Sequence, residues 1–193
     1  MSMRSAFTAV YDQAAWHNGS GPGSGEAETA VWREFLRGYL RQHRIGAVLD
    51  LGCGDWQWAR LVDWTGIAYH GIDVVPKVIE DNIACYARPG VTFGCADITT
   101  CPLPAADLIL CKEVLQHWPL GAIRNFRRRT AWRPRVLAVN DWAPVTVNPD
   151  IAPGGYRPLD LQAPPFGWPV REVLRYTLAY ADGTREVKVA AEL

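Results

Sequence analysis

The sequence predicts an α/β domain with a doubly wound, mostly parallel sheet of seven strands, and three observations support this. Short apolar runs alternate with stretches whose apolar residues recur at helical spacing. The chain has 193 residues, the length of one domain. Two strand-like segments at the C-terminus flank Asp182-Gly183, a pair typical of a tight hairpin turn. The five expected parallel strands are residues 47–51, 70–74, 91–96, 107–111 and 135–140, and the hairpin covers 176–191.

Helical patterns occupy the intervals between the expected strands. Helices are expected over 28–42, 76–86 and 120–131, and shorter ones near 56–62 and 170–175. Residues 1–27 form a lead-in with a glycine-rich tract over 18–25, which we interpret as a lid. Residues 141–169 hold seven prolines and form a long irregular loop. Such loops in compact domains are usually functional, so we assign this one to the substrate side.

Composition restricts the function classes. The 20 basic and 20 acidic residues cancel, so nothing global attracts nucleic acid or an anionic membrane. The basic run Arg124–Arg135 is interpreted as the solvated end of a helix. No apolar run is long enough to span a bilayer. The five cysteines include no CxxC pair, so we expect free thiols in a cytoplasmic protein and no metal site.

The strongest motif is Val48-Leu49-Asp50-Leu51-Gly52-Cys53-Gly54-Asp55, an apolar strand that runs into a glycine turn. Ligands of open α/β sheets bind at the carboxyl ends of the strands. Glycines let a ligand approach the backbone closely. A helix N-terminus after the turn would offer amides to a carboxylate, and Asp50 would suit an ammonium group. An amino-acid group carries both charges.

A second acid, Asp73, ends the next expected strand. A carboxylate at this position accepts hydrogen bonds from both hydroxyls of a ribose. Together with the glycine turn it predicts a nucleoside ligand. The alternative is a dinucleotide, but its fingerprint needs a third glycine where this chain has Gln57.

With these motifs, residues 28–142 resemble the class I S-adenosylmethionine-dependent methyltransferases. Further matches are Cys95-Ala96-Asp97-Ile98 and the segment from Ala106 to His117. The resemblance implies a Rossmann-like methyltransferase fold that binds S-adenosylmethionine and releases S-adenosylhomocysteine. The cofactor site it implies consists of Asp50, Gly52, Cys53, Gly54, Asp73, Val74, Asp97, Ile98, Cys111 and Lys112, with Trp16 in the lid. In this resemblance Asp73 and Val74 hold ribose and adenine, and Asp97 caps the adenine amino group.

The acceptor side is less defined. His117 follows the fourth strand, and its near-neutral pKa suits a general base, although a structural or orienting role is equally open. Enzymes that methylate the exocyclic nitrogens of nucleic-acid bases typically carry an Asn/Asp-Pro-Pro-Tyr pattern after this strand. Here Cys111-Lys112-Glu113-Val114 stands in its place, which argues against a nucleic-acid substrate. We expect Trp118, Asn140, Trp142 and Tyr11 to contact the acceptor, with Asp141 and Arg157 as further polar anchors. The alternative for the aromatic residues is packing.

The resulting hypothesis is a methyltransferase for a small-molecule O or N nucleophile, acting as a monomer or homodimer without nucleic-acid or membrane partners. Two alternatives remain. One is a methyltransferase-like binding module that has lost catalysis. The other is an NAD(P)-binding oxidoreductase.

Overall fold

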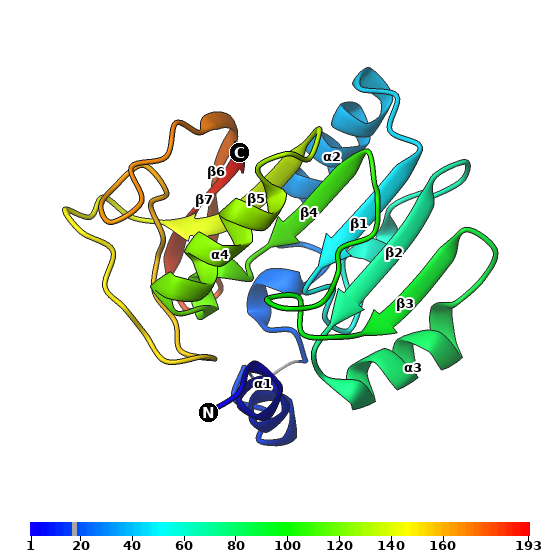
Figure 1. Cartoon of the computed structure of the whole chain (residues 1–193), viewed down its shortest axis with the longest axis horizontal. Helices are drawn as coiled ribbons and strands as arrows, with labels where there is room; N and C mark the ends of the chain where they lie inside the picture. Colours follow the sequence, from blue (N-terminus) through cyan, green and yellow to red (C-terminus); the bar gives the residue numbers. More distant parts are fainter. Residues whose placement is uncertain (17–18) are drawn as a thin grey trace. The chain divides into compact units, whose positions relative to one another are not determined.

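The fold was analysed in a computed structural model that describes residues 1–16 and 19–193 (Figure 1). Asn18 of the glycine-rich tract lies outside the described residues. The α-helices are α1 (Met3–Asp12), α2 (Ala30–Gln42), α3 (Pro76–Tyr86) and α4 (Leu120–Thr130). Short 3₁₀ turns are η1 (Pro22–Ser24), η2 (Ala59–Leu61) and η3 (Leu115–His117). The strands are β1 (Ala47–Leu51), β2 (Ala68–Asp73), β3 (Val91–Cys95), β4 (Leu108–Lys112), β5 (Val136–Trp142), β6 (Arg171–Ala179) and β7 (Arg185–Glu192).

The seven strands have the order β3-β2-β1-β4-β5-β7-β6. Strands β1, β2 and β3 pair in parallel, whereas β7 pairs antiparallel with both β5 and β6. The predicted fold class, with its C-terminal hairpin, is therefore confirmed. The chain divides into two compact units, residues 1–109 and 110–193, and the boundary falls inside β4. Each unit is described by itself below.

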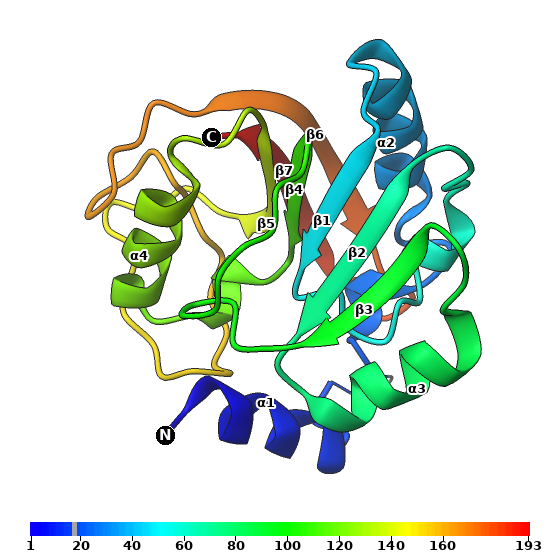
Figure 2. The same ribbon diagram turned by 45° about the vertical axis from the view of Figure 1, so that its right-hand side comes forward.

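Unit 1 is built on the parallel pairing of β1 with β2 and of β2 with β3. In the register Leu51 lies beside Ile72, and Asp73 lies beside Cys95, so the carboxyl ends of these strands share one edge. Helix α3 runs alongside β3, as Figures 1 and 2 both show. Helix α2 buries Trp32 and Leu36 completely. The site residues of this unit therefore extend from a rigid, buried framework.

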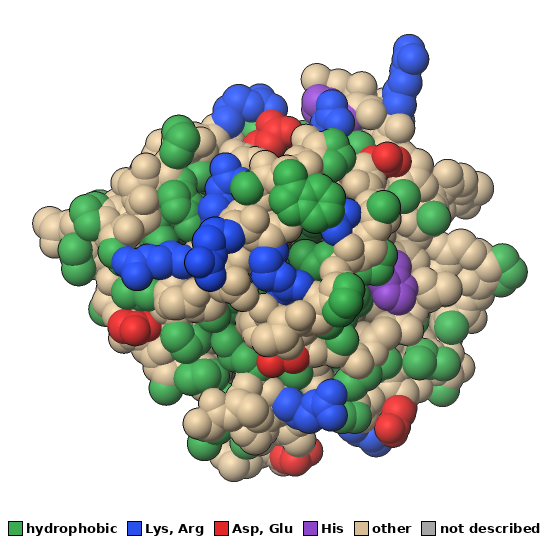
Figure 3. Space-filling view, viewed as in Figure 1, with side chains coloured by type: hydrophobic (Ala, Val, Ile, Leu, Met, Phe, Trp, Pro, Cys, Tyr) green, Lys and Arg blue, Asp and Glu red, His purple; other side chains and the backbone are tan. Residues whose placement is uncertain are grey.

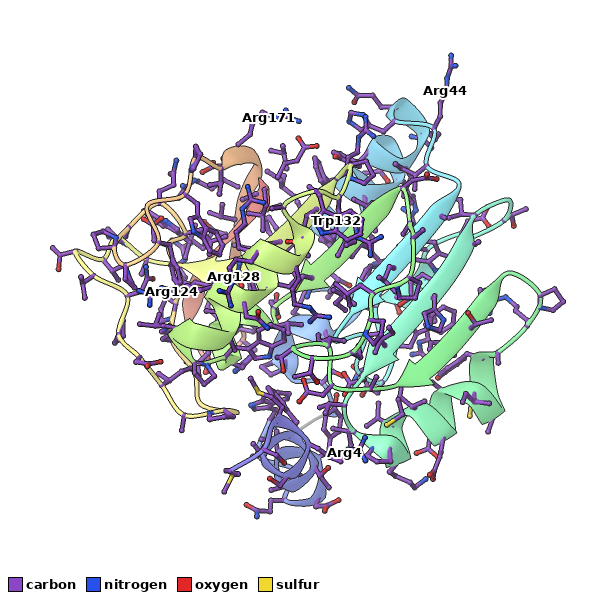
Figure 4. All side chains as sticks on the ribbon, viewed as in Figure 1. Arg4, Arg44, Arg124, Arg128, Trp132 and Arg171 are labelled. Atoms are coloured by element: carbon purple, nitrogen blue, oxygen red, sulfur yellow. The ribbon has the colours of Figure 1, made fainter. Side chains whose placement is uncertain are left out.

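Unit 2 is built on the antiparallel pairing of β5, β7 and β6. Asp141 lies beside Lys188 across the β5–β7 pair. Helix α4 buries Ile123 and Phe126, and it presents Arg124 and Arg128 outward, where basic side chains gather on the surface (Figures 3 and 4). The basic run is thus the solvated end of a helix, as predicted. In the described part of the chain, no helix is long and apolar enough to cross a bilayer.

Two local predictions were wrong, and one helix was not predicted. The segment near 56–62 contains only the 3₁₀ turn η2, because Trp56 takes a left-handed conformation with φ 60° and interrupts a helix there. The segment near 170–175 is the start of β6, since pairing with β7 outweighs its weak helical pattern. Within the lead-in, residues 3–12 form α1, a helix that the lid interpretation did not include.

Candidate active site

The glycine turn after β1 is fixed to β2 by its own backbone. The amides of Gly52 and Cys53 both donate to the carbonyl oxygen of Ile72, at 2.8 and 3.1 Å. Gly52 and Gly54 have φ values of 77° and 54°, which favour glycine because a Cβ atom is strained there. The turn is therefore held in one geometry at the carboxyl ends of the strands.

Asp73 joins the glycine turn to the end of β2. Its Oδ2 accepts from the Gly54 amide at 3.1 Å, and its Oδ1 accepts from the Val75 amide at 3.0 Å. The Asn82 side chain also donates to the Gly54 carbonyl, at 2.7 Å. Burial raises the pKa of Asp73, and its backbone hydrogen bonds oppose that rise. Each carboxylate oxygen has a second acceptor position, so the group suits a ligand that brings two hydroxyls.

Asp50 lies deeper in unit 1 than the sequence suggested. Its side chain is 1% exposed, and Oδ2 accepts from the Tyr69 hydroxyl at 2.6 Å. The carboxylate thus ties β1 to the neighbouring strand at the base of the turn. The role predicted from the sequence, a contact with an ammonium group, stays a prediction.

The segment after β3 continues the same edge of the sheet. The amide of Ala96 donates to the Asp73 carbonyl at 2.9 Å. The Oδ1 atom of Asp97 accepts from the amide and the hydroxyl of Thr99, at 2.9 and 2.6 Å, which orients the carboxylate. Ile98 is buried, and Val74 is partly exposed. Asp97, Val74 and Ile98 therefore lie on the chain segments that directly follow β2 and β3.

A latch joins the lead-in to the glycine turn. The Ser20 hydroxyl donates to Asp55 Oδ1 at 2.7 Å and accepts from the Asp55 amide at 2.9 Å, and the Ser20 amide donates to Oδ2 at 3.1 Å. The hydroxyls of Tyr11 and Ser20 are 2.7 Å apart. A Cβ atom on Gly54 would come within 2.2 Å of Ser20 Oγ, so only glycine permits this approach.

The latch also changes the expected place of Tyr11. A Cβ atom on Gly54 would lie 3.1 Å from the Tyr11 hydroxyl, so this hydroxyl lies beside the glycine turn, where burial and the charge of Asp73 raise its pKa. The Trp16 ring packs edge-on against Phe7 and Tyr11, with centroids 6.0 and 6.1 Å apart. Tyr11, expected at the acceptor, thus stands with Trp16 in the lead-in beside the cofactor-side residues.

The amides of the turn differ from the expected helix N-terminus. Every amide from residue 52 to residue 56 donates within unit 1, to Ile72, Asp73, Ser20 or Cys53. Trp56 is 1% exposed, and no α-helix begins there. The turn therefore presents no row of open amides, because its amides from residue 52 to residue 56 are already hydrogen-bonded.

In unit 2, His117 is held by a short backbone ladder. The amide of Gly154 donates to the His117 carbonyl at 3.0 Å, and the amide of Arg157 donates to the Gln116 carbonyl at 3.2 Å. The His117 Nδ1 atom lies 2.8 Å from the Gly155 carbonyl, which only accepts, so Nδ1 carries the proton and the lone pair is on Nε2. Burial lowers the pKa of His117, although this hydrogen bond opposes the shift. The ring is therefore neutral at pH 7.

A buried charge cluster lies in the same unit. Lys188 is 1% exposed and forms ion pairs with Asp141, with Glu186 at 2.9 Å and with Glu113 at 3.2 Å. Lys112 pairs with Glu113 at 3.0 Å. Burial works against the charge of Lys188, but the surrounding carboxylates outweigh it and raise its pKa. The cluster is thus a buried lysine whose charge is compensated by three neighbouring carboxylates.

The charge cluster is connected to the His117 segment. Gln116 donates from Nε2 to Asp141 Oδ2 at 3.0 Å and accepts the Asp141 amide on Oε1 at 2.7 Å. The Tyr156 hydroxyl donates to the same Oδ2 at 3.1 Å, and its ring centroid lies 5.8 Å from that of His117. Asp141 therefore holds both Gln116, which precedes His117 in the chain, and Tyr156, whose ring lies near that of His117.

The other predicted residues of unit 2 are distributed differently. Trp118 is 2% exposed, and its ring packs edge-on against Phe126 at 6.1 Å, so it belongs to the core. Asn140 and Trp142 line a small cavity and point to the face of β5 opposite Asp141, because strand residues alternate. Cys111 and Lys112 are buried at the end of β4. The structure does not group Asn140 and Trp142 with Asp141 and the residues around His117.

Several site residues were missed in the sequence. They are Ser20, Asp55, Tyr69 and Asn82 in unit 1, and Glu113, Gln116 and Lys188 in unit 2. A lysine between two valines of a strand was the one available signal, since a charge in an apolar run needs a partner.

Comparisons with known proteins agree with this geometry. Residues 49–131 match the family model described as a methyltransferase domain. The sequence matches none of the curated proteins with which it was compared. The resemblance to class I S-adenosylmethionine-dependent methyltransferases, indicated by the motifs, is confirmed by this match and by the fold.

Solved structures share the fold at low sequence identity. One is the 1,6-didemethyltoxoflavin-N1-methyltransferase of Burkholderia thailandensis, bound to 1,6-didemethyltoxoflavin and S-adenosylhomocysteine. It is 18% identical, with a TM-score of 0.68 over 98% of this chain and 86% of that one. A methyltransferase of Anabaena variabilis is 13% identical, with a TM-score of 0.67 over 100% and 94%. The N-methyltransferase NodS of Bradyrhizobium japonicum is 14% identical, with a TM-score of 0.58 over 87% and 88%.

The latch predicts local protection of the lead-in. Ser20→Ala removes a hydroxyl that bonds both the side chain and the amide of Asp55, at a cost of roughly 1–2 kcal/mol. Amide exchange at Ser20 and Asp55 should become about tenfold faster or more. Ser5→Ala, an exposed serine of α1, is the control and should leave both amides unchanged. Unaltered exchange in Ser20→Ala would mean that the latch does not hold the segment.

The charge cluster predicts a large loss of stability when its cation is removed. Lys188→Met leaves Asp141 buried without its counter-charge and leaves Glu113 with Lys112 alone, and an uncompensated buried charge typically costs about 3–5 kcal/mol. Urea unfolding should show this loss. Lys77→Met removes an exposed ion pair with Asp81 and should change stability little. Equal stabilities for the two variants would contradict the assignment.

Proposed function

We propose that the chain is an S-adenosylmethionine-dependent methyltransferase for a small-molecule O or N nucleophile, with its cofactor bound in unit 1. One observation carries this proposal: the glycine turn and the acid of the second strand share a hydrogen bond, from the Gly54 amide to Asp73 Oδ2 at 3.1 Å. A turn and an acid that meet at one strand edge form the nucleoside-binding corner of such sheets.

The chemistry of the residues fits this cofactor. Asp73 would accept the ribose hydroxyls on the second acceptor positions of its two oxygens. Asp97 keeps its Oδ2 for the adenine amino group, since Thr99 uses Oδ1. Val74 and Ile98 supply apolar surface. When bound, the cofactor supplies a methyl group on a sulfonium, and Trp16 in the lead-in would exclude water from it.

His117 is proposed as the general base for a hydroxyl acceptor. Its Nδ1 proton is committed to Gly155, so Nε2 is the atom that takes the acceptor's proton. A neutral amine needs no base for the attack itself, and for such an acceptor His117 would only orient the substrate. Most of the acceleration comes from holding donor and acceptor in line.

The neighbours support a small acceptor. The Burkholderia protein is bound to a small heterocycle together with S-adenosylhomocysteine. NodS is an N-methyltransferase, crystallised with S-adenosylhomocysteine. Both neighbours are named as N-methyltransferases, but their low sequence identity to this chain does not decide between an O and an N acceptor.

The two alternatives have less support. A dinucleotide needs a helix N-terminus for its pyrophosphate, whereas this turn leads to Trp56 and the short η2. A module without catalysis would have no need for a neutral, oriented histidine. Turnover on any acceptor would exclude this second alternative.

The cofactor assignment predicts that Asp73→Ala weakens binding. Losing hydrogen bonds to a charged acceptor costs about 1.5–3 kcal/mol, or roughly 10- to 150-fold in the dissociation constant. Titration calorimetry with S-adenosylmethionine measures this, with circular dichroism to verify folding. Asp63→Ala, an exposed acid of the same unit, is the control. An unchanged affinity in Asp73→Ala would refute the assignment.

The base assignment predicts a pH profile. Because burial lowers the pKa of His117, methyl transfer to a phenolic acceptor should be flat above pH 7 and fall in acid, where the ring becomes protonated. His117→Gln should lower kcat by about 10²–10⁴ and abolish the acid limb. A radiolabelled methyl-transfer assay on a panel of small phenols measures both. Full kcat in His117→Gln at every pH would reduce the histidine to an orienting role.

A further inference from the structure

The segment that holds His117 also carries a buried arginine. Arg157 is 3% exposed, and its amide donates to the Gln116 carbonyl at 3.2 Å. The ladder of residues 154–157 against 116–118 therefore fixes the backbone of Arg157 one step from His117. The Arg157 guanidinium also bonds the carbonyl of Trp118, the residue after His117, so backbone and side chain of Arg157 both contact the segment that carries the histidine.

The guanidinium of Arg157 uses only part of its donor capacity. Its Nη1 atom donates to the Trp118 carbonyl at 2.8 Å. Its Nε and Nη2 atoms are buried and have no hydrogen-bond partner among the described residues. The hydrogens on Nε and Nη2 lie on one edge of the guanidinium plane and point in parallel. This edge matches the two oxygens of a carboxylate.

No carboxylate of the described residues pairs with this edge within ion-pair distance. Burial lowers the pKa of Arg157, and the charge of Asp150 opposes the shift from a distance. Asp150 itself accepts the amides of Leu120 and Ile151, at 2.8 and 2.9 Å. A buried charge with two unmet donors is costly, so an anion from outside the chain would relieve it.

We propose that the methyl acceptor carries a carboxylate, which the Nε–Nη2 edge of Arg157 binds while the nucleophilic atom faces His117. The proposal rests on the proposed function and adds the substrate class. A planar, two-oxygen anion fits the fork better than a single charged oxygen does. Because both nitrogens are closed to water, the acceptor reaches them through a movement of the surrounding chain, and the bonds formed there are strong.

The test observes Arg157 directly. The Nε–H resonance of Arg157 is assigned by its loss in Arg157→Lys, and ¹⁵N-labelled wild-type protein with S-adenosylhomocysteine is titrated with benzoate, phenylacetate and 4-hydroxybenzoate. At least one carboxylate should shift this resonance with saturation, whereas the matching primary amide should not. Arg157→Lys should weaken that carboxylate at least tenfold. Arg124→Lys, on the exposed face of α4, should leave it unchanged.

Three results would overturn the proposal. They are no shift with any of the carboxylates, an equal shift with carboxylate and amide, and a shift with inorganic phosphate alone. The affinity of Arg157→Lys for S-adenosylhomocysteine should equal that of the wild type, which separates an acceptor site from a cofactor site. The same carboxylate titration can be made on wild-type protein without cofactor. It therefore tests the arginine even if S-adenosylhomocysteine does not bind, and failure of the proposed function is distinguished from failure of this proposal.

Discussion

The geometry of unit 1 depends on one carbonyl oxygen, that of Ile72. It accepts the amides of Gly52 and Cys53, and the next amide, Gly54, then reaches Asp73. The turn cannot move against β2 without breaking all three bonds, so strand pairing sets the position of the site. Because these amides are already hydrogen-bonded, they are not open to a ligand as the amides of a helix N-terminus would be. The groups that stay open to further hydrogen bonds are the carboxylates at the strand ends, which suit hydroxyl and amino donors.

Unit 2 reaches comparable order without regular structure around its histidine. The segment 154–157 meets 116–118 through backbone hydrogen bonds, and Gln116 and Asp141 bond each other twice. They place the Gly155 carbonyl against His117, and this carbonyl determines which nitrogen of the ring carries the proton. An irregular loop therefore orients the histidine, because its polar groups are paired with a strand end.

The sequence predicted the residues whose role follows from local pattern. Asp73 was found because an apolar strand ends there, and Gly54 because a sharp turn needs glycine. Ser20 and Gln116 could not be found, because their partners are distant in the chain and meet only through the fold. The lysine at 188 indicated a partner, but the sequence did not identify that partner as Asp141. Alternation along β5 also separates Asn140 from Asp141, although the two are adjacent in sequence. The order of residues along the chain was enough to predict the loop after β5. The pairing of strands decides which side chains near it face one another.

Two buried cations of unit 2, Lys188 and Arg157, differ in the number of carboxylates that pair with them. Lys188 is surrounded by Glu113, Asp141 and Glu186, which compensate its desolvation within the chain. Arg157 is also buried, but among the described residues its guanidinium donates only to the carbonyl of Trp118. Both charges would cost several kcal/mol if left alone. Since the chain neutralises Lys188 fully, it has the means to neutralise a buried cation. The open edge of Arg157, beside a histidine with a fixed tautomer, therefore marks where the missing charge belongs to a substrate.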